Sequence, residues 1–162
     1  MEKIFNSLGQ SLFSQLNNGE DLILSFYGEN SQFVRFNNAS VRQTGLVDDA
    51  DIGLKFIANG RTCSGGFTVS GNFDTDLKRG CAEIDRMRSE SNQIPEDPFV
   101  VMPENSGSSH EIKKANGLAF DEAVDAILPA VSGVDFVGIL ANGKMYRGSA
   151  NNLGQKHWFE TE

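Results

Sequence analysis

Histidine and cysteine, two residue types that often hold metals or act in catalysis, are few in this chain. It contains two histidines, His110 and His157. His110 precedes Glu111, but the zinc-protease pattern His-Glu-x-x-His needs a second histidine at position 114, where the chain has Lys114, and the wider spacing meets Ala115. Two imidazoles cannot make a histidine-rich zinc site, so we predict no metal site in this chain and interpret His110 as a loop residue.

The two cysteines, Cys63 and Cys81, lack Cys-x-x-Cys spacing, which argues against a zinc knuckle or a disulfide framework. A thiolate–imidazole nucleophile needs an open, electropositive setting. Sequence patterns place Cys63 in a strand and Cys81 on the apolar face of a helix, so we interpret both as buried thiols. A small cysteine-dependent enzyme is a third hypothesis, and it would require rapid alkylation of a native thiol.

The glycine-rich stretch SGGFTVSG, residues 64–71, has neither a P-loop lysine nor the spacing of a dinucleotide fingerprint. The helix that follows begins with an acidic residue, Asp74, which would repel a phosphate. Gly65 and Gly66 interrupt a predicted strand, and paired glycines there indicate a bulge or a close backbone approach. We therefore find no catalytic constellation and no cofactor-binding residue.

The last eighteen residues, MYRGSANNLGQKHWFETE, hold the remaining candidates. Arg147 could pair with a carboxylate, Trp158 could anchor an interface, and with Asn152 they are our candidate peptide or interface contacts. The alternatives are a solvated strand arginine and a core tryptophan. Asn151, Asn152 and Gly154 fit a turn.

Hydrophobic spacing predicts the elements that must position these residues. A helix that ends at Asn18-Gly19 carries one apolar stripe of Ile4, Leu8, Leu12 and Leu16. Two strands, 22–27 and 33–36, are joined by a turn at 28–31, and further strands are predicted at 40–46 and 52–57. Asn59-Gly60 is a strong hairpin signal that leads into a return strand at 62–69.

The rest of the chain is predicted to form a central helix, a long connection and a second helix followed by strands. Asp74 is predicted to cap a helix whose apolar face carries Leu77, Cys81, Ile84 and Met87. Residues 91–117 hold three of the four prolines and read as a long connection. A second apolar stripe follows, made by Phe120, Val124, Ile127 and Leu128 and ended or kinked by Pro129. Strands at 134–140 and 145–149 flank a predicted turn at Asn142-Gly143.

A shift of 112 residues superposes the two halves. It places Leu8, Leu12 and Leu16 on Phe120, Val124 and Leu128, and aligns Arg35 with Arg147. Each half alone is a one-sided helix with a marginal hairpin, so we expect the halves to pack together. We predict an α+β fold of two layers, with about three helices on a largely antiparallel sheet and an internal helix–hairpin duplication.

The bulk composition limits the partners. With 162 residues the chain is expected to form one domain, 1–162. Its net charge is −8 and no basic patch is visible, which argues against nucleic acid. The first eighteen residues have helical apolar spacing rather than an unbroken hydrophobic run, so we expect neither a signal peptide nor a membrane span. We therefore expect the protein to be cytoplasmic.

The order of three patches resembles the amino-terminal region of the TldD/PmbA family of zinc metallopeptidases, also described as modulators of DNA gyrase. The patches are FVRFNNASVRQTGLVDDADIGLKFIANGRTCSGGF, DTDLKRGCAEI and VGILANGKMYRGSANNLGQKHWFE. They resemble the family's opening strands, the helix after them, and an Arg-bearing strand with an Asn-Ser-Leu-Gly stretch, in which Asn152 replaces the commoner serine.

The resemblance covers nearly the whole chain but only about the first third of a family member. It implies a two-subunit assembly of like or paralogous chains that degrades or matures peptides, with zinc bound by a His-Glu-x-x-x-His helix outside this region. No position here matches that helix, so no catalytic residue carries over. Our first hypothesis is a non-catalytic amino-terminal domain that shapes the peptide channel or subunit contact. Our second is a stand-alone protein- or peptide-interaction module with no proteolytic role.

Overall fold

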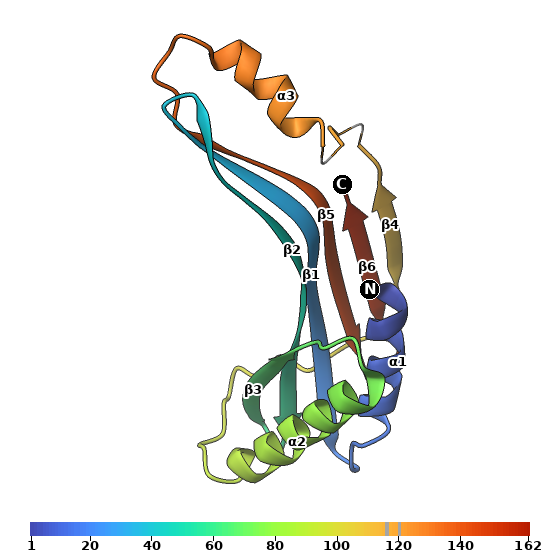
Figure 1. Cartoon of the computed structure of the whole chain (residues 1–162). Coiled ribbons are helices and arrows are strands. Elements are labelled where there is room, and N and C mark those ends of the chain that lie inside the picture. The colour runs from blue at the N-terminus through green and yellow to red at the C-terminus, as the bar shows by residue number, and fades with distance from the viewer. Residues whose placement is uncertain (116, 120) are drawn as a thin grey trace.

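A computed structural model describes residues 1–115, 117–119 and 121–162, and it confirms the α+β class. Six strands form one sheet in the order β3-β2-β1-β5-β6-β4. Neighbouring strands are antiparallel, except that β4 and β6 are parallel. Figure 1 shows that α1 and α2 lie against one end of this sheet and that α3 lies near the other end.

The elements of the described residues follow in chain order. They are α1 (Glu2–Phe13), β1 (Glu20–Asn37), β2 (Ser40–Ala58), β3 (Arg61–Thr68), α2 (Phe73–Ser91), β4 (Ser109–Lys113), α3 (Ala123–Ile127), a 3₁₀ turn η1 (Leu128–Val131), β5 (Gly138–Asn151) and β6 (Lys156–Thr161).

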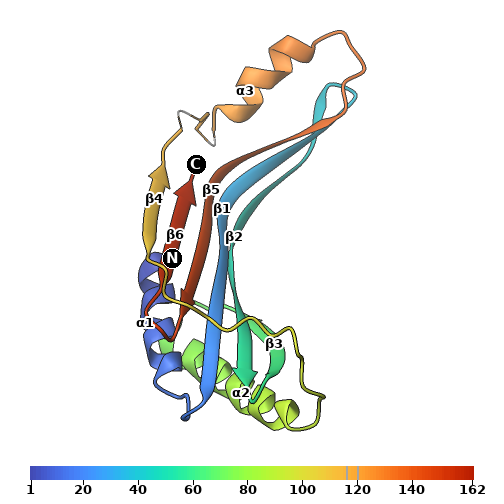
Figure 2. The same cartoon turned by 180° about the vertical axis from the view of Figure 1, so that it is seen from behind.

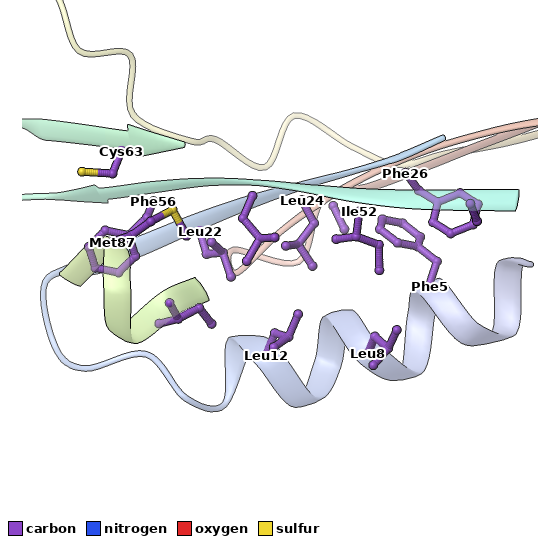
Figure 3. Packing of buried hydrophobic residues seen from close by; sticks show 14 of the residues in the cluster. Phe5, Leu8, Leu12, Leu22, Leu24, Phe26, Ile52, Phe56, Cys63 and Met87 are labelled. Atoms are coloured by element: carbon purple, nitrogen blue, oxygen red, sulfur yellow. The ribbon is translucent and has the colours of Figure 1, made fainter. Parts of the chain in front are cut away.

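The main core lies between the two longer helices and the sheet (Figure 3). Phe5, Leu8 and Leu12 of α1 pack on alternate residues of the central strands, because only every second strand side chain points to the helical layer. The buried strand members on this face include Leu22, Leu24, Phe26, Ile52, Leu54 and Phe56.

The strands are longer than the sequence predicts. The turn predicted at 28–31 is wrong, because β1 runs unbroken for 18 residues through it. Gly28 pairs with Ala50 on one side and with Tyr146 on the other. Partners on both sides satisfy the backbone groups of a continuous strand, and this ladder outweighs the local turn signal. The predicted strands 40–46 and 52–57 likewise form one strand, β2.

The turn predicted at Asn142-Gly143 is also wrong, since both residues lie inside β5. A Cβ on Gly143 would collide with the carbonyl oxygen of Asn30, so the glycine allows β5 to approach β1 closely. The predicted strand at 134–140 begins later than expected, because residues 134–137 lie outside β5. Because β1 and β5 pair directly, the two halves of the chain are in contact; the duplication itself stays a prediction.

The real hairpin turns have the backbone geometry that such turns need. Asn59-Gly60 joins β2 to β3 with φ of 51° and 67°, which confirms the predicted hairpin. Asn38-Ala39 joins β1 to β2 with φ of 49° and 50°. The turn predicted from Asn151, Asn152 and Gly154 lies between β5 and β6.

Two helix boundaries need correction. The helix α1 ends at Phe13 rather than Asn18, and Leu16 packs on the core from the following turn. Asn72, not Asp74, caps α2, and its side chain accepts a hydrogen bond from the Thr75 backbone N–H at 3.0 Å. On α2, Ile84 and Met87 are buried as predicted, whereas Leu77 and Cys81 are half-buried at the edge of the core.

Pro129 acts as predicted: α3 ends at Ile127 and the 3₁₀ turn η1 contains the proline. The expected contribution of Phe120 to the stripe of α3 lies outside the described residues. The connection predicted over 91–117 contains a strand, β4, so His110 is a strand residue rather than a loop residue. Residues 92–108 cross the sheet face opposite α1 and α2 (Figure 2).

Beyond the ends of β3 and β6, three strands continue as an arm, which we define as residues 29–37 of β1, 40–49 of β2 and 138–144 of β5 (Figures 1 and 2). Val34 and Phe36 are buried on the arm face toward α3. Phe36 contacts Phe136, with ring centroids 5.7 Å apart. This second, smaller core positions α3 over the arm.

Candidate functional site

Trp158 lies in the main core and only 2% of it is exposed. Its ring contacts Phe5, Phe26 and Tyr146 at centroid distances of 6.0, 5.5 and 6.1 Å. Gly148, opposite Trp158 on β5, leaves the space that the Phe5 ring fills. Trp158 is therefore a core residue rather than an interface anchor, and almost none of its surface is available to a partner.

Asn152 holds the β5–β6 turn to the start of β1. Its Oδ1 accepts a hydrogen bond from the Leu22 backbone N–H at 2.9 Å, and its Nδ2 donates to the Asp21 carboxylate at 2.9 Å. The Asn152 backbone N–H also donates to the Leu22 carbonyl. With both amide groups engaged inside the chain, Asn152 acts as a clamp for the turn.

Arg147 is the one exposed residue of the three candidates. The centre of its guanidinium lies 3.7 Å from the ring centroid of Tyr27, the residue directly opposite on β1. One nitrogen donates to the Tyr146 carbonyl at 2.9 Å. Within the described ranges no ion pair joins Arg147 to a carboxylate. Stacking fixes the plane of the guanidinium and leaves donors for a carboxylate or a carbonyl.

A shallow pocket of about 200 Å³ adjoins Arg147 on the same sheet face. Its polar lining includes Ser109 of β4 and His157 of β6, whose Oγ and Nδ1 lie 2.8 Å apart. Sequence reasoning missed this pair, because the parallel pairing that places Ser109 opposite His157 joins segments 48 residues apart. The pocket offers hydrogen-bonding groups.

Neither cysteine is in a reactive setting. Burial is the main cause that raises the pKa of the Cys63 and Cys81 thiols, and nearby carboxylates, Glu90 and Asp85 respectively, raise them further. Both therefore stay protonated at neutral pH. The structure gives no support to the cysteine-enzyme hypothesis.

Metal ligands do not gather in the part of the chain that the structure describes. No group of three or more His, Cys, Asp or Glu side chains there could hold an ion. His110 instead contacts Glu2 of α1 at 3.2 Å. Among the helices described, none is both long and apolar enough to cross a membrane.

Unpaired strand edges are the other exposed feature. β3 pairs with β2 only from Asp51 to Ala58, so β2 from Ser40 to Asp49 has a partner on one side only among the described strands. β4 is the outer strand at the opposite edge, and all five of its residues are exposed. Free strand edges are able to accept an added extended segment.

No protein-family model and no curated protein matches the sequence significantly. The structure, in contrast, is similar to solved structures. TldE from Thermococcus kodakarensis aligns with a TM-score of 0.69 at 12% identity, over 98% of this chain and 37% of that one. A protein from Thermotoga maritima that is named as a modulator of a DNA gyrase aligns with a TM-score of 0.67 at 15% identity, over 97% and 37%.

This chain has the TldD/PmbA fold. A third structure, named as a modulator of DNA gyrase from Bacteroides thetaiotaomicron, aligns over 98% of this chain and 38% of that one with a TM-score of 0.65 and 12% identity. The chain thus spans a little over a third of the length of each TldD/PmbA-fold structure. At these identities the likeness establishes the fold, as the order of the three sequence patches predicted.

Proposed function

We propose that this chain is the non-catalytic amino-terminal domain of a TldD/PmbA-like peptidase of the cytosol, where it shapes the substrate channel or a contact with a second like or paralogous subunit. One observation carries the proposal. Nearly the whole chain aligns with a segment that makes up a little over a third of the length of each similar structure. The role in peptide degradation or maturation rests on the resemblance described above.

The surface of the chain supports a role in holding polypeptide rather than in cleaving it. Among the described strands, the outer edge of β4 and the edge of β2 over residues 40–49 have no partner, and strand edges bind extended chains through main-chain hydrogen bonds. Arg147 and the Ser109–His157 pair add donors on an adjoining face. No metal-holding cluster exists among the residues that the structure places.

Zinc titration of the isolated chain tests the proposal. We expect calorimetry to show no stoichiometric zinc site, and we expect no hydrolysis of unfolded peptides by the chain alone. A His110→Gln, His157→Gln double variant tests whether any zinc that binds is held by imidazole at a site within these residues. One-to-one binding in the micromolar range that this variant abolishes would contradict the proposal, because the zinc site should lie outside these residues.

The second candidate is a stand-alone module that binds proteins or peptides and has no proteolytic role. The free edge of β2 favours it, since an edge can bind a strand without any catalytic domain. The gene sequence beyond the codon for Glu162 separates the two candidates. A downstream His-Glu-x-x-x-His segment supports the peptidase, and a stop codon supports the module.

A further inference from the structure

The arm contains one polar side chain that is buried without a hydrogen-bond partner at its amide nitrogen. Gln32 of β1 is 7% exposed, and its Nε2 has no partner among the described residues. Gln32 lines a pocket of about 240 Å³ between the arm and α3. The other lining residues are Val34, Thr44, Gly45, Leu46 and Val124.

An unsatisfied buried amide is costly, because removing a polar group from water without a replacement bond destabilises a protein by about 1–3 kcal/mol. Native proteins leave few such groups, and each one calls for a ligand, a buried water or a functional role. Asn142, opposite Gln32 on β5, does not remove the cost: its Nδ2 donates to the Leu118 carbonyl at 2.7 Å, and its Oδ1 has no partner within the same described set.

The pocket lies beside the unpaired edge of β2. The Ala50 carbonyl accepts a hydrogen bond from the Val69 N–H at 2.7 Å, which shows that the backbone groups of Ala50 point away from β1. Backbone groups alternate along a strand, so those of Thr44, Leu46 and Asp48 also point away from β1. No described strand pairs with them, because β3 pairs with β2 only from Asp51 onward.

The Gln32 pocket and the unpaired edge of β2 lie on one side of the arm. Leu46 is opposite Gln32 and Thr44 is opposite Val34 in the β1–β2 register, so their side chains share the face that lines the pocket. Leu46 is 76% exposed, which is high for a large apolar side chain in a strand. An added strand would cover Leu46 and could direct one of its own side chains toward Gln32.

We propose that an extended polypeptide segment pairs with β2 along residues 44–48 and inserts one side chain into this pocket. The Gln32 Nε2 is closed to solvent in the free chain, so the Gln32 amide turns toward the pocket on binding and donates a hydrogen bond to an oxygen of the inserted side chain. Asp48 lies two residues along β2 from Leu46 on the same face and disfavours a carboxylate, so the inserted side chain is neutral, such as a glutamine carboxamide. The apolar lining from Val34, Leu46 and Val124 suits its methylene groups.

This inference deepens the proposed function, because it locates where polypeptide binds, and it rests on polypeptide being the ligand class. The two can fail separately. Zinc titration and the downstream gene sequence test the peptidase context, whereas neither result changes the geometry of Gln32 and the β2 edge. Strand binding at this site would also hold for a stand-alone module.

Fluorescence anisotropy with three labelled decapeptides tests the site. Each probe alternates threonine and valine, and one central position carries Gln, Glu or Leu. We expect the Gln probe to bind the full chain about tenfold more tightly than the Glu or Leu probe, the effect of one buried hydrogen bond. Equal affinity for all three probes, or no binding by any of them, would overturn the proposal.

Two variants identify the site. Leu46→Pro removes an outward N–H that bonds to no described strand, and Leu46→Thr is the matched control that keeps this donor. We expect Leu46→Pro to weaken the Gln probe at least tenfold relative to Leu46→Thr, with circular dichroism showing both variants folded. Equal binding by the two variants would exclude pairing at this edge.

Gln32→Met separates a ligand-binding amide from a structural one. We expect the variant to keep or raise the melting temperature, since it removes an unsatisfied buried group, while it binds the Gln probe no better than the Leu probe. A melting temperature lowered by several degrees with unchanged probe selectivity would show that the amide holds a structural water, and the proposal would fail.

Discussion

At the scale of single residues, Asp76 of α2 is the clearest case of a polar side chain that the fold requires. It is fully buried, and its carboxylate accepts hydrogen bonds from the Ser70 N–H at 2.9 Å, the Ser70 hydroxyl at 2.7 Å and the Gly71 N–H at 3.1 Å. These bonds hold the strand-to-helix connection, in which Gly71 has a φ of +81°.

We expect Asp76→Asn to lower the free energy of unfolding by about 1–3 kcal/mol, measured by urea denaturation. The amide can accept with only one of its two ends, and its NH₂ would face a backbone donor. Asp74→Asn is the control in the same helical turn, where Asp74 is exposed, and it should cost less than about 1 kcal/mol. Equal losses in the two variants would show that the Asp76 contacts do not stabilise the connection.

At the scale of elements, one ion pair joins the start of β1 to α2. Arg88 donates from Nε and Nη2 to the two carboxylate oxygens of Glu20 at 2.6 and 2.8 Å, and Nη2 also donates to the Gln15 carbonyl after α1 at 3.0 Å. The Arg88 hydrogen bonds are the largest cause that lowers the pKa of Glu20 below its ordinary value of 4.5. Such a two-point contact fixes geometry better than a single surface pair.

A carboxylate with a lowered pKa stabilises the fold above the pKa of its unfolded state, and this contribution disappears as pH falls through the folded pKa. We therefore expect Glu20→Gln to lower the free energy of unfolding by about 1–2 kcal/mol at pH 7. The difference from wild type should shrink as pH falls below about 4.5, the ordinary pKa of this carboxyl.

The measurement is urea denaturation of both proteins at pH 7 and pH 3. Glu96→Gln is the control, because Glu96 pairs with Arg61 at 3.2 Å but its side chain is 71% exposed, and such pairs contribute little. A Glu20→Gln effect of the same size at both pH values would contradict the assigned role of the charge.

At the scale of the whole molecule, the thiols report how the main core opens. Cys63 belongs to the core, and Cys81 packs against it from α2. We expect both to react slowly with an alkylating reagent in native protein. Exposure of Cys63 requires separation of α2 from the sheet, so its rate should rise with urea in parallel with unfolding. Cys81 is half-buried, and its raised pKa keeps the thiol protonated and slow to react. Rapid labelling of either thiol without urea would revive the cysteine-enzyme hypothesis.

The sequence predicted the helical layer well for a physical reason. Apolar spacing in 2–13 and 73–91 reports directly which side of a helix is buried, and Asn59-Gly60 makes a turn whose positive φ values need those residues. Pro129 also correctly predicted the end of a helix, since α3 ends at Ile127 and a 3₁₀ turn follows it. The order of three patches along the chain correctly indicated the TldD/PmbA fold.

Only the tertiary structure decided the strand lengths and the sites. Glycine and asparagine at 28–31 and 142–143 are turn signals taken alone, yet neighbouring strands on β1 and β5 keep these segments extended. Pairing across distant segments also placed Ser109 beside His157 and enclosed Trp158 in the core. It left the Gln32 amide nitrogen without a described partner next to the free edge of β2. Short-range spacing determines which residues favour a helix or a tight turn. Hydrogen bonds between segments distant in the chain determine which groups are exposed, enclosed or left without a partner.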